Sequence, residues 1–452
     1  MAAVLAVAVT PAAARDAAFV LMTPGGAQVR LITAAQCPVA LIDGQSVPMA
    51  VRAAAATVPQ RPTASAPALS KPSDFPVTVC EAAIPAGAKQ IVVAGQALPA
   101  PRARMNRIVV IGDTGCRMKA ADNAWQACRD PAAFPFARIA ASAAAWRPDL
   151  IIHVGDYHYR ENPCPAGNAG CADSPWGYGW DAWDADFFTP AAPLLAAAPL
   201  AAARGNHESC ARAGQGWWRF LAAGPRSAAQ ACDDPANDHA GDVSPAFAVD
   251  LGGGARAIIM DLSAAGGSAL ASNDWRVPAF RDSYRQAADL ARGSRFAFAV
   301  DHYPILGFAG EHREGATQLK PGNAAIQSVF GTFGPRQAPP GIDMLLAGHV
   351  HLWQQVSFAS DHPGQFITGF SGTLEDLVPM PVRVPAGATP APGAVVDGFS
   401  SWTNGFGYMT LTRRGARRWA AEVHAVDGRI VNRCTIVGRQ SRCQLPQVDG
   451  QD

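Results

Sequence analysis

The chain has 452 residues, 16% of them charged, and a formal net charge of +1 at pH 7. This length allows one large domain with a smaller appendage, or two to three domains. Because the net charge is close to zero, the composition gives no electrostatic basis for binding nucleic acid or an anionic membrane. No apolar run reaches the roughly 18 residues that a membrane-spanning helix needs, so we expect no membrane span.

Residues 1–14 form an alanine-rich apolar start that ends in small residues near Ala14. This pattern is typical of the back half of a secretory signal peptide whose basic beginning is missing. An alanine-rich disordered start is the alternative. We therefore expect an exported protein, periplasmic or secreted.

Residues 15–104 contain short apolar runs that predict a small β-rich N-terminal domain. A stretch rich in proline and serine, residues 57–76, interrupts these runs and predicts a long surface loop. No residue pattern in this region points to a particular chemistry.

None of the ten cysteines forms a CxxC pair, which disfavours a structural zinc site or a thioredoxin-type redox motif. An even count in loop-like sequence instead favours disulfides and an oxidising compartment. Nearest-neighbour pairing predicts five bridges, although sequence alone leaves other pairings open: Cys37 with Cys80, Cys116 with Cys128, Cys164 with Cys171, Cys210 with Cys232, and Cys434 with Cys443.

Residues 105–452 show a different pattern, in which apolar runs of strand length alternate with alanine-rich segments such as 135–148 that predict helices. This alternation predicts an α/β architecture with a layered sheet covered on both faces. The strand-length runs lie at residues 107–111, 150–154, 256–260, 296–300 and 343–347. Further on, the arginine-rich residues 413–418 lie between two strand-like runs, which favours an exposed hairpin turn over a binding patch.

Five short loops follow predicted strands and carry carboxylate, amide, imidazole and phenol groups. These oxygen and nitrogen donors suit iron, zinc or manganese better than a thiolate cluster would. A single Gly-Asp or Gly-Asn pair has little value as a signal, but five such loops in one order predict a shared site at the strand ends. The loops are GDTG (112–115), GDYHY (155–159), GNHE (205–208), DHYP (301–304) and GHVH (348–351).

These motifs resemble the calcineurin-like metallophosphoesterase superfamily and, within it, the purple acid phosphatases. Gly115 stands where most of that superfamily places a metal-binding His, and Tyr159 compensates for it. The fourth motif departs from the family pattern, because Ala299 replaces a Val three residues before His302. The resemblance spans residues 113–351 and implies a β-sandwich flanked by helices.

The resemblance also implies two metal ions. Asp113, Asp156, Tyr159 and His351 would bind the first, and Asp156, Asn206, His302 and His349 would bind the second, so that Asp156 bridges. A phenolate favours a hard trivalent ion, which predicts Fe(III) in the Tyr159 site and Zn, Mn or Fe(II) in the other.

Supporting roles are more open. His207 would stabilise charge on the phosphoryl group, and Glu208 would orient a ligand. His312 would protonate the leaving group, as a His beyond the equivalent ligand does in plant members of the family; the alternative is an exposed loop His. His158 would either join the centre or point away from it. Arg160 and Arg313 are candidate phosphate contacts, or else members of exposed ion pairs.

The resulting prediction is a secreted, binuclear, metal-dependent phosphatase that hydrolyses small phosphate monoesters by attack of a metal-bound hydroxide. A phosphodiesterase with the same metal centre, acting on nucleotide or phospholipid diesters, is the nearest alternative. A phosphate-binding or adhesion protein with a relic metal site is the third.

Overall fold

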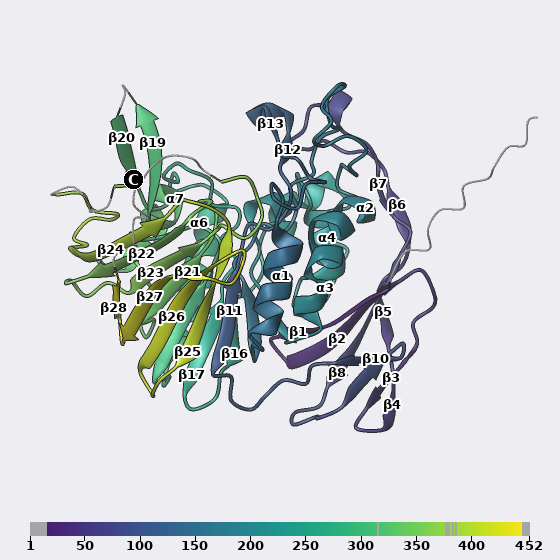
Figure 1. The fold of residues 1–452 in the computed structure, drawn as a ribbon, viewed down its shortest axis with the longest axis horizontal. Coiled ribbons are helices and arrows are strands. Elements are labelled where there is room, and N and C mark those ends of the chain that lie inside the picture. Colours follow the sequence, from purple (N-terminus) through teal and green to yellow (C-terminus); the bar gives the residue numbers. More distant parts are fainter. Residues whose placement is uncertain (1–15, 314–315, 376–379, 382–383, 385–386, 445–452) are drawn as a thin grey trace, which may run out of the picture.

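The computed structural model describes residues 16–313, 316–375, 380–381, 384 and 387–444 (Figure 1). The signal-like residues 1–14 lie outside this range, and so does the side chain of His312. Two large sheets and the helices on their outer faces form most of the described chain (Figure 1).

The larger sheet has 11 strands within the described residues and mixes parallel and antiparallel pairs. At its centre β11, β14 and β15 run parallel to one another. In spatial order the strands are β28 (Gln440–Cys443), β27 (Ile430–Val437), β26 (Arg418–Ala425), β25 (Gly407–Arg413), β11 (Arg107–Ile111), β14 (Leu150–His153), β15 (Leu200–Ala202), β1 (Ala17–Thr23), β2 (Gly26–Thr33), β8 (Thr78–Ile84) and β5 (Ala50–Ala53).

The second sheet has seven strands, of which β17, β18, β21 and β23 are parallel neighbours. Its strands in spatial order are β16 (Phe247–Asp250), β17 (Ala255–Ile259), β18 (Phe296–Val300), β21 (Met344–Ala347), β23 (Gly364–Thr368), β22 (Trp353–Phe358) and β24 (Val396–Trp402).

The two sheets pack face to face, and the alternation of side chains along each strand builds the layers. Ile108 and Val110 of β11 face the core shared with β18 and β21, where Phe298 and Leu346 lie. The intervening Val109 points to the opposite face, toward the helices. Each central strand is therefore apolar on both faces, which explains why the sequence shows continuous apolar runs there.

Helices cover both outer faces of this sandwich. One group packs on the larger sheet: α1 (Phe136–Ala145), α3 (Thr189–Leu195) and α4 (Gly214–Phe220). A second group packs on the seven-stranded sheet: α6 (Arg276–Ala291) and α7 (Ala324–Phe330). The short helices α2 (Trp180–Trp183) and α5 (Asp238–Gly241) complete the set, and a π-helical turn, Asp184–Phe188, joins α2 to α3. The predicted layered α/β fold is confirmed, and no helix in the described part of the chain is long and apolar enough to cross a membrane.

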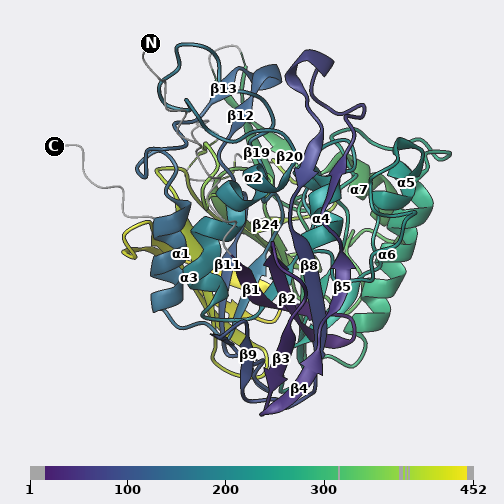
Figure 2. The same cartoon turned by 90° about the vertical axis from the view of Figure 1, so that its right-hand side faces the viewer.

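The β-rich N-terminal region, predicted over residues 15–104, contributes strands to the larger sheet. Strand β1 pairs in parallel with β15 through Leu21 and Leu200, and β2, β8 and β5 extend the sheet beyond it. The region also forms a small sheet that lies beside these strands in Figure 2, of β10 (Gln96–Leu98), β9 (Ile91–Val93), β3 (Val39–Ile42) and β4 (Gln45–Pro48). The N-terminal strands β1, β2, β8 and β5 thus share a hydrogen-bonded sheet with the rest of the chain.

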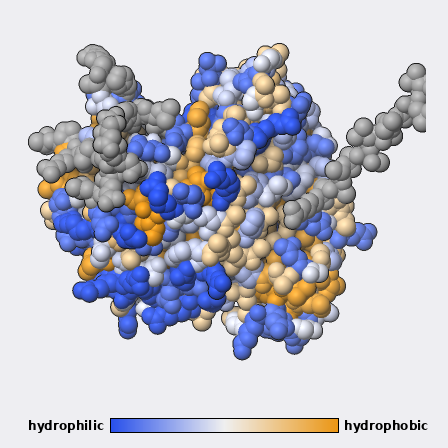
Figure 3. Space-filling model, in the orientation of Figure 1, coloured by the Kyte–Doolittle hydropathy of each residue, from blue (hydrophilic) through white to orange (hydrophobic). Residues whose placement is uncertain are grey.

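The surface is mainly polar over the C-terminal strands, whereas hydrophobic residues gather over the N-terminal strands at the lower right of Figure 3. Three large hydrophobic residues of these N-terminal strands are exposed, namely Val39 and Leu41 of β3 and Val51 of β5. Three two-stranded ribbons complete the fold: β12 (Met118–Lys119) with β13 (Ala124–Trp125), β19 (Phe308–Arg313) with β20 (Ala316–Pro321), and β6 (Ala56–Val58) with β7 (Ser73–Phe75).

All ten cysteines form disulfides, and the nearest-neighbour pairing is confirmed for each of the five bridges. The bridge from Cys37 to Cys80 spans 43 residues and encloses the proline-rich stretch. The bridge from Cys164 to Cys171 spans only 7 residues.

Replacing Cys37 and Cys80 together by serine is expected to lower the free energy of unfolding by about 4 kcal/mol, because the longer loop regains more conformational entropy in the unfolded chain. The double serine variant of Cys164 and Cys171 is the matched control, with an expected loss of only about 2 kcal/mol. Urea denaturation of both variants checks the ranking. An equal loss, or a larger one for the shorter loop, would contradict the entropic explanation.

Candidate metal centre

The predicted site residues arrive from both sheets at one edge of the sandwich. Asp113, Asp156 and Asn206 follow the parallel strands β11, β14 and β15 of the larger sheet. His302 and the motif of His349 and His351 follow β18 and β21, which are parallel neighbours in the second sheet. The carboxyl ends of parallel strands meet at one edge, so the topology gathers residues that are distant in sequence.

Backbone geometry in these loops is specialised for close approach. Asp113, Asp156 and His349 have positive φ angles of 54°, 57° and 70°, a region that side-chain-bearing residues rarely occupy. A Cβ atom on Gly205 would lie 2.1 Å from Asp156 Oδ1, and one on Gly348 would lie 2.4 Å from Asp113 Oδ2. Glycine is therefore required at both positions for the carboxylates to reach the site.

The hydroxyl of Tyr159 lies where the first group of donors converges. Its oxygen is 2.9 Å from Asp113 Oδ1, 2.9 Å from Asp156 Oδ2 and 3.0 Å from His351 Nε2. The side chain is buried, with 1% of the residue exposed. These four residues are the ones predicted for the first metal, and the structure brings all of them together.

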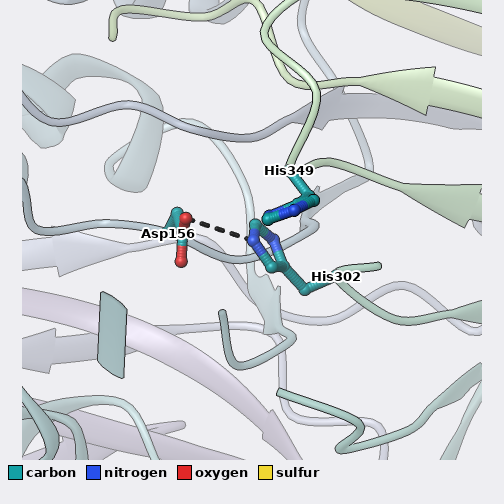
Figure 4. A group of neighbouring side chains, drawn as sticks. All are labelled: Asp156, His302 and His349. Atoms are coloured by element: carbon teal, nitrogen blue, oxygen red, sulfur yellow. Dashed lines mark ion pairs between the residues drawn. The ribbon is translucent and has the colours of Figure 1, made fainter. Parts of the chain in front are cut away.

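The second predicted group is equally close. Asn206 Oδ1 lies 3.0 Å from His302 Nε2 and 3.0 Å from His349 Nδ1, and His302 Nε2 is 3.1 Å from Asp156 Oδ2. Figure 4 shows Asp156 and His302 joined by this ion pair, with His349 beside them. Potential ligand atoms of these three residues all lie within 4.8 Å of one another. Asp156 belongs to both groups through a single oxygen, Oδ2.

Two of the imidazole rings are fixed by a hydrogen bond between Nδ1 and a backbone carbonyl oxygen, as is usual for metal-ligating histidines. His302 Nδ1 lies 2.9 Å from the carbonyl oxygen of Val154, and His351 Nδ1 lies 2.7 Å from that of Leu374. Each ring therefore directs Nε2 toward the carboxylates. Carboxylate, phenol, amide and imidazole donors in this arrangement fit two transition-metal ions.

Glu208 organises the loop that carries Asp156. Its carboxylate accepts hydrogen bonds from the backbone N–H groups of Asp156 (3.1 Å), Tyr157 (2.8 Å), His158 (3.2 Å) and Gly205 (3.0 Å). Burial and the nearby Asp156 carboxylate raise the pKa of Glu208 to about 8. Glu208 therefore contacts the backbone of the ligand loops, and its orienting role stays a prediction.

The charges within the centre compensate one another. Burial raises the pKa of Asp156, but His302 and His207 outweigh it and hold that pKa well below its usual range. Conversely, burial lowers the pKa of His302, but the Asp156 carboxylate raises it to about 9. Burial and the carboxylate of Asp113 raise the pKa of Tyr159. A metal ion bound to the phenol and the imidazole would therefore have to displace protons.

His207 lies over the centre. Its ring packs on that of Tyr159 with 3.9 Å between centroids, and its backbone N–H donates to Asp156 Oδ1 at 2.8 Å. Nδ1 lies 3.0 Å from the carbonyl oxygen of His158 and 3.1 Å from Glu161 Oε1. Burial and the positive charge of Arg212 lower the pKa of His207 to about 4.

Two residues beside His207 were missed by sequence reasoning, namely Glu161 and Arg212. Glu161 is 2% exposed and forms an ion pair with Arg212, whose Nη2 also lies 2.7 Å from His207 Nε2. Neither residue belongs to a metal-ligand motif. The only available signals were their positions, two residues after Tyr159 and four after Glu208.

Other candidates lie away from the metal ligands. The ring of His158 packs near Tyr178 and Trp183, and its Nε2 lies 2.8 Å from the carbonyl oxygen of Gly177. Arg160 is 4% exposed and donates from Nε to Asp186 Oδ1 at 2.7 Å, so it forms a buried ion pair. The backbone of His312 lies in β19, opposite Thr317 of β20, while its side chain is outside the described part of the chain. The predicted role of His312 stays a prediction.

A cavity of about 690 Å³ adjoins the second group of donors. His349 and Tyr303 are among its lining residues, and their rings are 4.2 Å apart between centroids. Phe308, Lys320 and Asn323 line the part formed by the β19–β20 ribbon and the start of α7. This volume lies in the range of small-molecule sites and leaves room for an organic group beside the ligands.

The comparisons with known proteins agree with this geometry. The sequence model of the calcineurin-like phosphoesterase family matches residues 106–352, and a search of curated proteins found no match. Among solved structures, a purple acid phosphatase from yellow lupin (Lupinus luteus) seeds has 14% identity and a TM-score of 0.56, with 94% of this chain and 74% of that chain covered. A structure of PhoD has 11% identity and a TM-score of 0.51, with 96% of this chain and 92% of that chain covered. The chain therefore belongs to the calcineurin-like phosphoesterase family and is a metal-dependent phosphoric ester hydrolase.

Proposed function

We propose that the chain is an exported phosphatase that hydrolyses small phosphate monoesters at a binuclear metal centre. The observation that carries this proposal is the position of Asp156 Oδ2, 2.9 Å from the Tyr159 hydroxyl and 3.1 Å from His302 Nε2. One carboxylate oxygen thus lies between two complete sets of donors. A relic site would be expected to have lost donors, whereas here every predicted ligand is present and converges.

In this proposal Asp113, Asp156, Tyr159 and His351 hold the first ion, and Asp156, Asn206, His302 and His349 hold the second. The phenol of Tyr159 favours Fe(III) in the first position, with Zn, Mn or Fe(II) in the second. Bound ions would supply Lewis acidity toward the phosphoryl oxygens and lower the pKa of a coordinated water.

The protein's own groups would position the ester and balance its charge. His207, packed over Tyr159, would stabilise negative charge on a phosphoryl oxygen through Nε2 once the ring carries a second proton, because the hydrogen of the neutral ring is held on Nδ1 by the His158 carbonyl and Glu161. The cavity beside His349 and Tyr303 would accommodate the organic part of the ester. Five disulfides support an oxidising location, periplasmic or extracellular.

The test is to hydrolyse p-nitrophenyl phosphate and bis(p-nitrophenyl) phosphate side by side, using disulfide-intact protein of recorded metal content. We expect a higher kcat/KM for the monoester. A higher value for the diester would move the protein to the phosphodiesterase alternative. If the protein binds two metal ions but hydrolyses neither substrate, it is not a phosphatase of broad specificity.

A further inference from the structure

A phosphate ester is negatively charged, and none of the proposed metal ligands is an arginine or lysine. A cationic side chain beside the centre is therefore a candidate contact for the phosphoryl group. The two arginines considered from the sequence do not fill this role among the described side chains. Arg160 is buried in its pair with Asp186, and the side chain of Arg313 lies outside the described part of the chain. Arg212, in the turn between the 3-10 helix Asn206–Glu208 and α4, is the cation that adjoins the centre.

The guanidinium of Arg212 is held along one edge. Nε donates to Glu161 Oε2 at 3.3 Å, and Nη2 donates to Glu161 Oε1. The remaining nitrogen, Nη1, makes no hydrogen bond within the described part of the chain, and the Arg212 side chain is 10% exposed. A planar guanidinium fixed on one edge in this way presents its other N–H groups in a defined direction.

Glu161 is itself fixed by several partners, so the direction of Arg212 is set before any substrate binds. Tyr178 donates its hydroxyl hydrogen to Glu161 Oε2 at 3.1 Å, and Ser65 Oγ lies 3.0 Å from the same hydroxyl. Ser65 belongs to the proline-rich stretch for which the sequence predicted only a surface loop. That stretch also pairs with the turn before Arg212, because the Ala64 N–H donates to the Ala211 carbonyl oxygen at 2.8 Å.

The position of Arg212 relative to the metal ligands follows from His207. Arg212 Nη2 lies 2.7 Å from His207 Nε2, and that same Nε2 is 3.8 Å from Asp156 Oδ2. Arg212 therefore lies beside the centre, on the side of His207.

We propose that Arg212 binds a phosphoryl oxygen of the substrate through Nη1 and thereby selects phosphate monoesters over diesters. This inference rests on the proposed function. A phosphate monoester offers three non-ester oxygens and a charge of about −1.5 to −2 at pH 7. If two oxygens face the metals, one remains for Arg212. A diester has only two non-ester oxygens and a single negative charge, so it has no oxygen left for the guanidinium.

Three variants of the metal-loaded protein test this role. Arg212→Met removes the cation, whereas Arg212→Lys keeps the positive charge but loses the planar guanidinium that hydrogen-bonds to Glu161. Arg129→Met is the control, because it removes an arginine whose side chain is 64% exposed. For Arg212→Met we expect kcat/KM on p-nitrophenyl phosphate to fall by about 10- to 150-fold, the loss of one charge-assisted hydrogen bond. The kcat/KM of Arg212→Met on bis(p-nitrophenyl) phosphate should change far less. On p-nitrophenyl phosphate, the kcat/KM of Arg212→Lys should lie between those of the wild type and Arg212→Met, and that of Arg129→Met should equal the wild-type value.

Binding of inorganic phosphate, measured by calorimetry on the same samples, separates this inference from the proposed function. We expect the Kd of phosphate to rise by about 10- to 150-fold in Arg212→Met at unchanged metal content. An unchanged Kd would overturn the role of Arg212 even if the wild type is a phosphatase. Equal losses on both esters in Arg212→Met and Arg212→Lys would also overturn it, since they would indicate a structural role. A third outcome is that the wild type prefers the diester and Arg212→Met binds phosphate more weakly than the wild type. This result would overturn the selectivity and the proposed function, but it would support the contact between Arg212 and a phosphoryl oxygen.

Discussion

Replacing Asp156 by Asn is expected to lower kcat/KM on p-nitrophenyl phosphate by more than about 100-fold, beyond what the loss of an outer-shell partner of a metal site costs. Oδ2 of Asp156 lies between the two donor groups, so one substitution weakens both metal positions. An amide oxygen carries no full negative charge, and an amide nitrogen facing His302 or Tyr159 offers hydrogens where a ligand is needed. Elemental analysis should show that the variant retains less metal per chain.

The fold of this variant should survive, because an amide oxygen at Oδ1 can still accept the hydrogen bond from the His207 N–H, which is 2.8 Å long in the wild type. Thermal unfolding of the metal-free protein checks this. Asp173→Asn is the matched control, since its side chain is 90% exposed and pairs only with Arg129 within the described residues. Undiminished hydrolysis in Asp156→Asn would show that the proposed bridge is wrong.

The strand ends were predictable from the sequence for a physical reason. Strands β11, β14, β18 and β21 are buried on both faces, so they read as continuous apolar runs, and each run is followed by its polar loop. The layered α/β class follows from the same alternation. The ligand sets could be assigned only through the family resemblance, because spacing does not say which oxygen faces which histidine.

The pairing of the N-terminal strands could not be predicted in the same way. Strand β1 joins β15 through Leu21 and Leu200, and nothing local to either segment encodes a partner so distant in sequence. The proline-rich stretch shows a related limit. Its composition predicts a surface loop, but Val58 and Phe75, in the β6–β7 ribbon at its ends, are buried in the core. Composition also cannot reveal that Ser65 hydrogen-bonds with Tyr178 beside the candidate site.

Arg212 and Glu161 illustrate why second-layer residues escape motif analysis. A metal ligand must occupy a strand end and have one of a few side chains, so its position is constrained. A residue that contacts the His207 ring can come from any neighbouring loop, and here Arg212 and Glu161 come from two different loops. Conversely, Arg160 has the right chemistry four residues after Asp156, yet it is used in a buried pair with Asp186.

Replacing Tyr159 by Phe is expected to abolish a visible absorption band that iron-loaded wild-type protein should show. The band would arise from charge transfer between a phenolate and iron, and Tyr159 is the phenol whose oxygen lies within 3.0 Å of Asp113, Asp156 and His351. In the metal-free protein the same change removes the hydroxyl whose single hydrogen faces two buried carboxylate oxygens. Leaving those oxygens without this partner should lower the stability of the metal-free form by about 1–3 kcal/mol.

Tyr157→Phe provides a close control, because Tyr157 is also fully buried and lies only two residues away. Its hydroxyl donates to the carbonyl oxygen of Ala203 at 3.0 Å. Tyr157→Phe should therefore lose a neutral hydrogen bond, worth about 0.5–1.5 kcal/mol, and keep the absorption band. A Cβ atom on Gly115 would lie 2.8 Å from the Tyr159 nitrogen, so a histidine at position 115 could not replace the phenol as a ligand. If iron-loaded wild-type protein shows no band, or if Tyr159→Phe keeps it, Tyr159 is not a ligand.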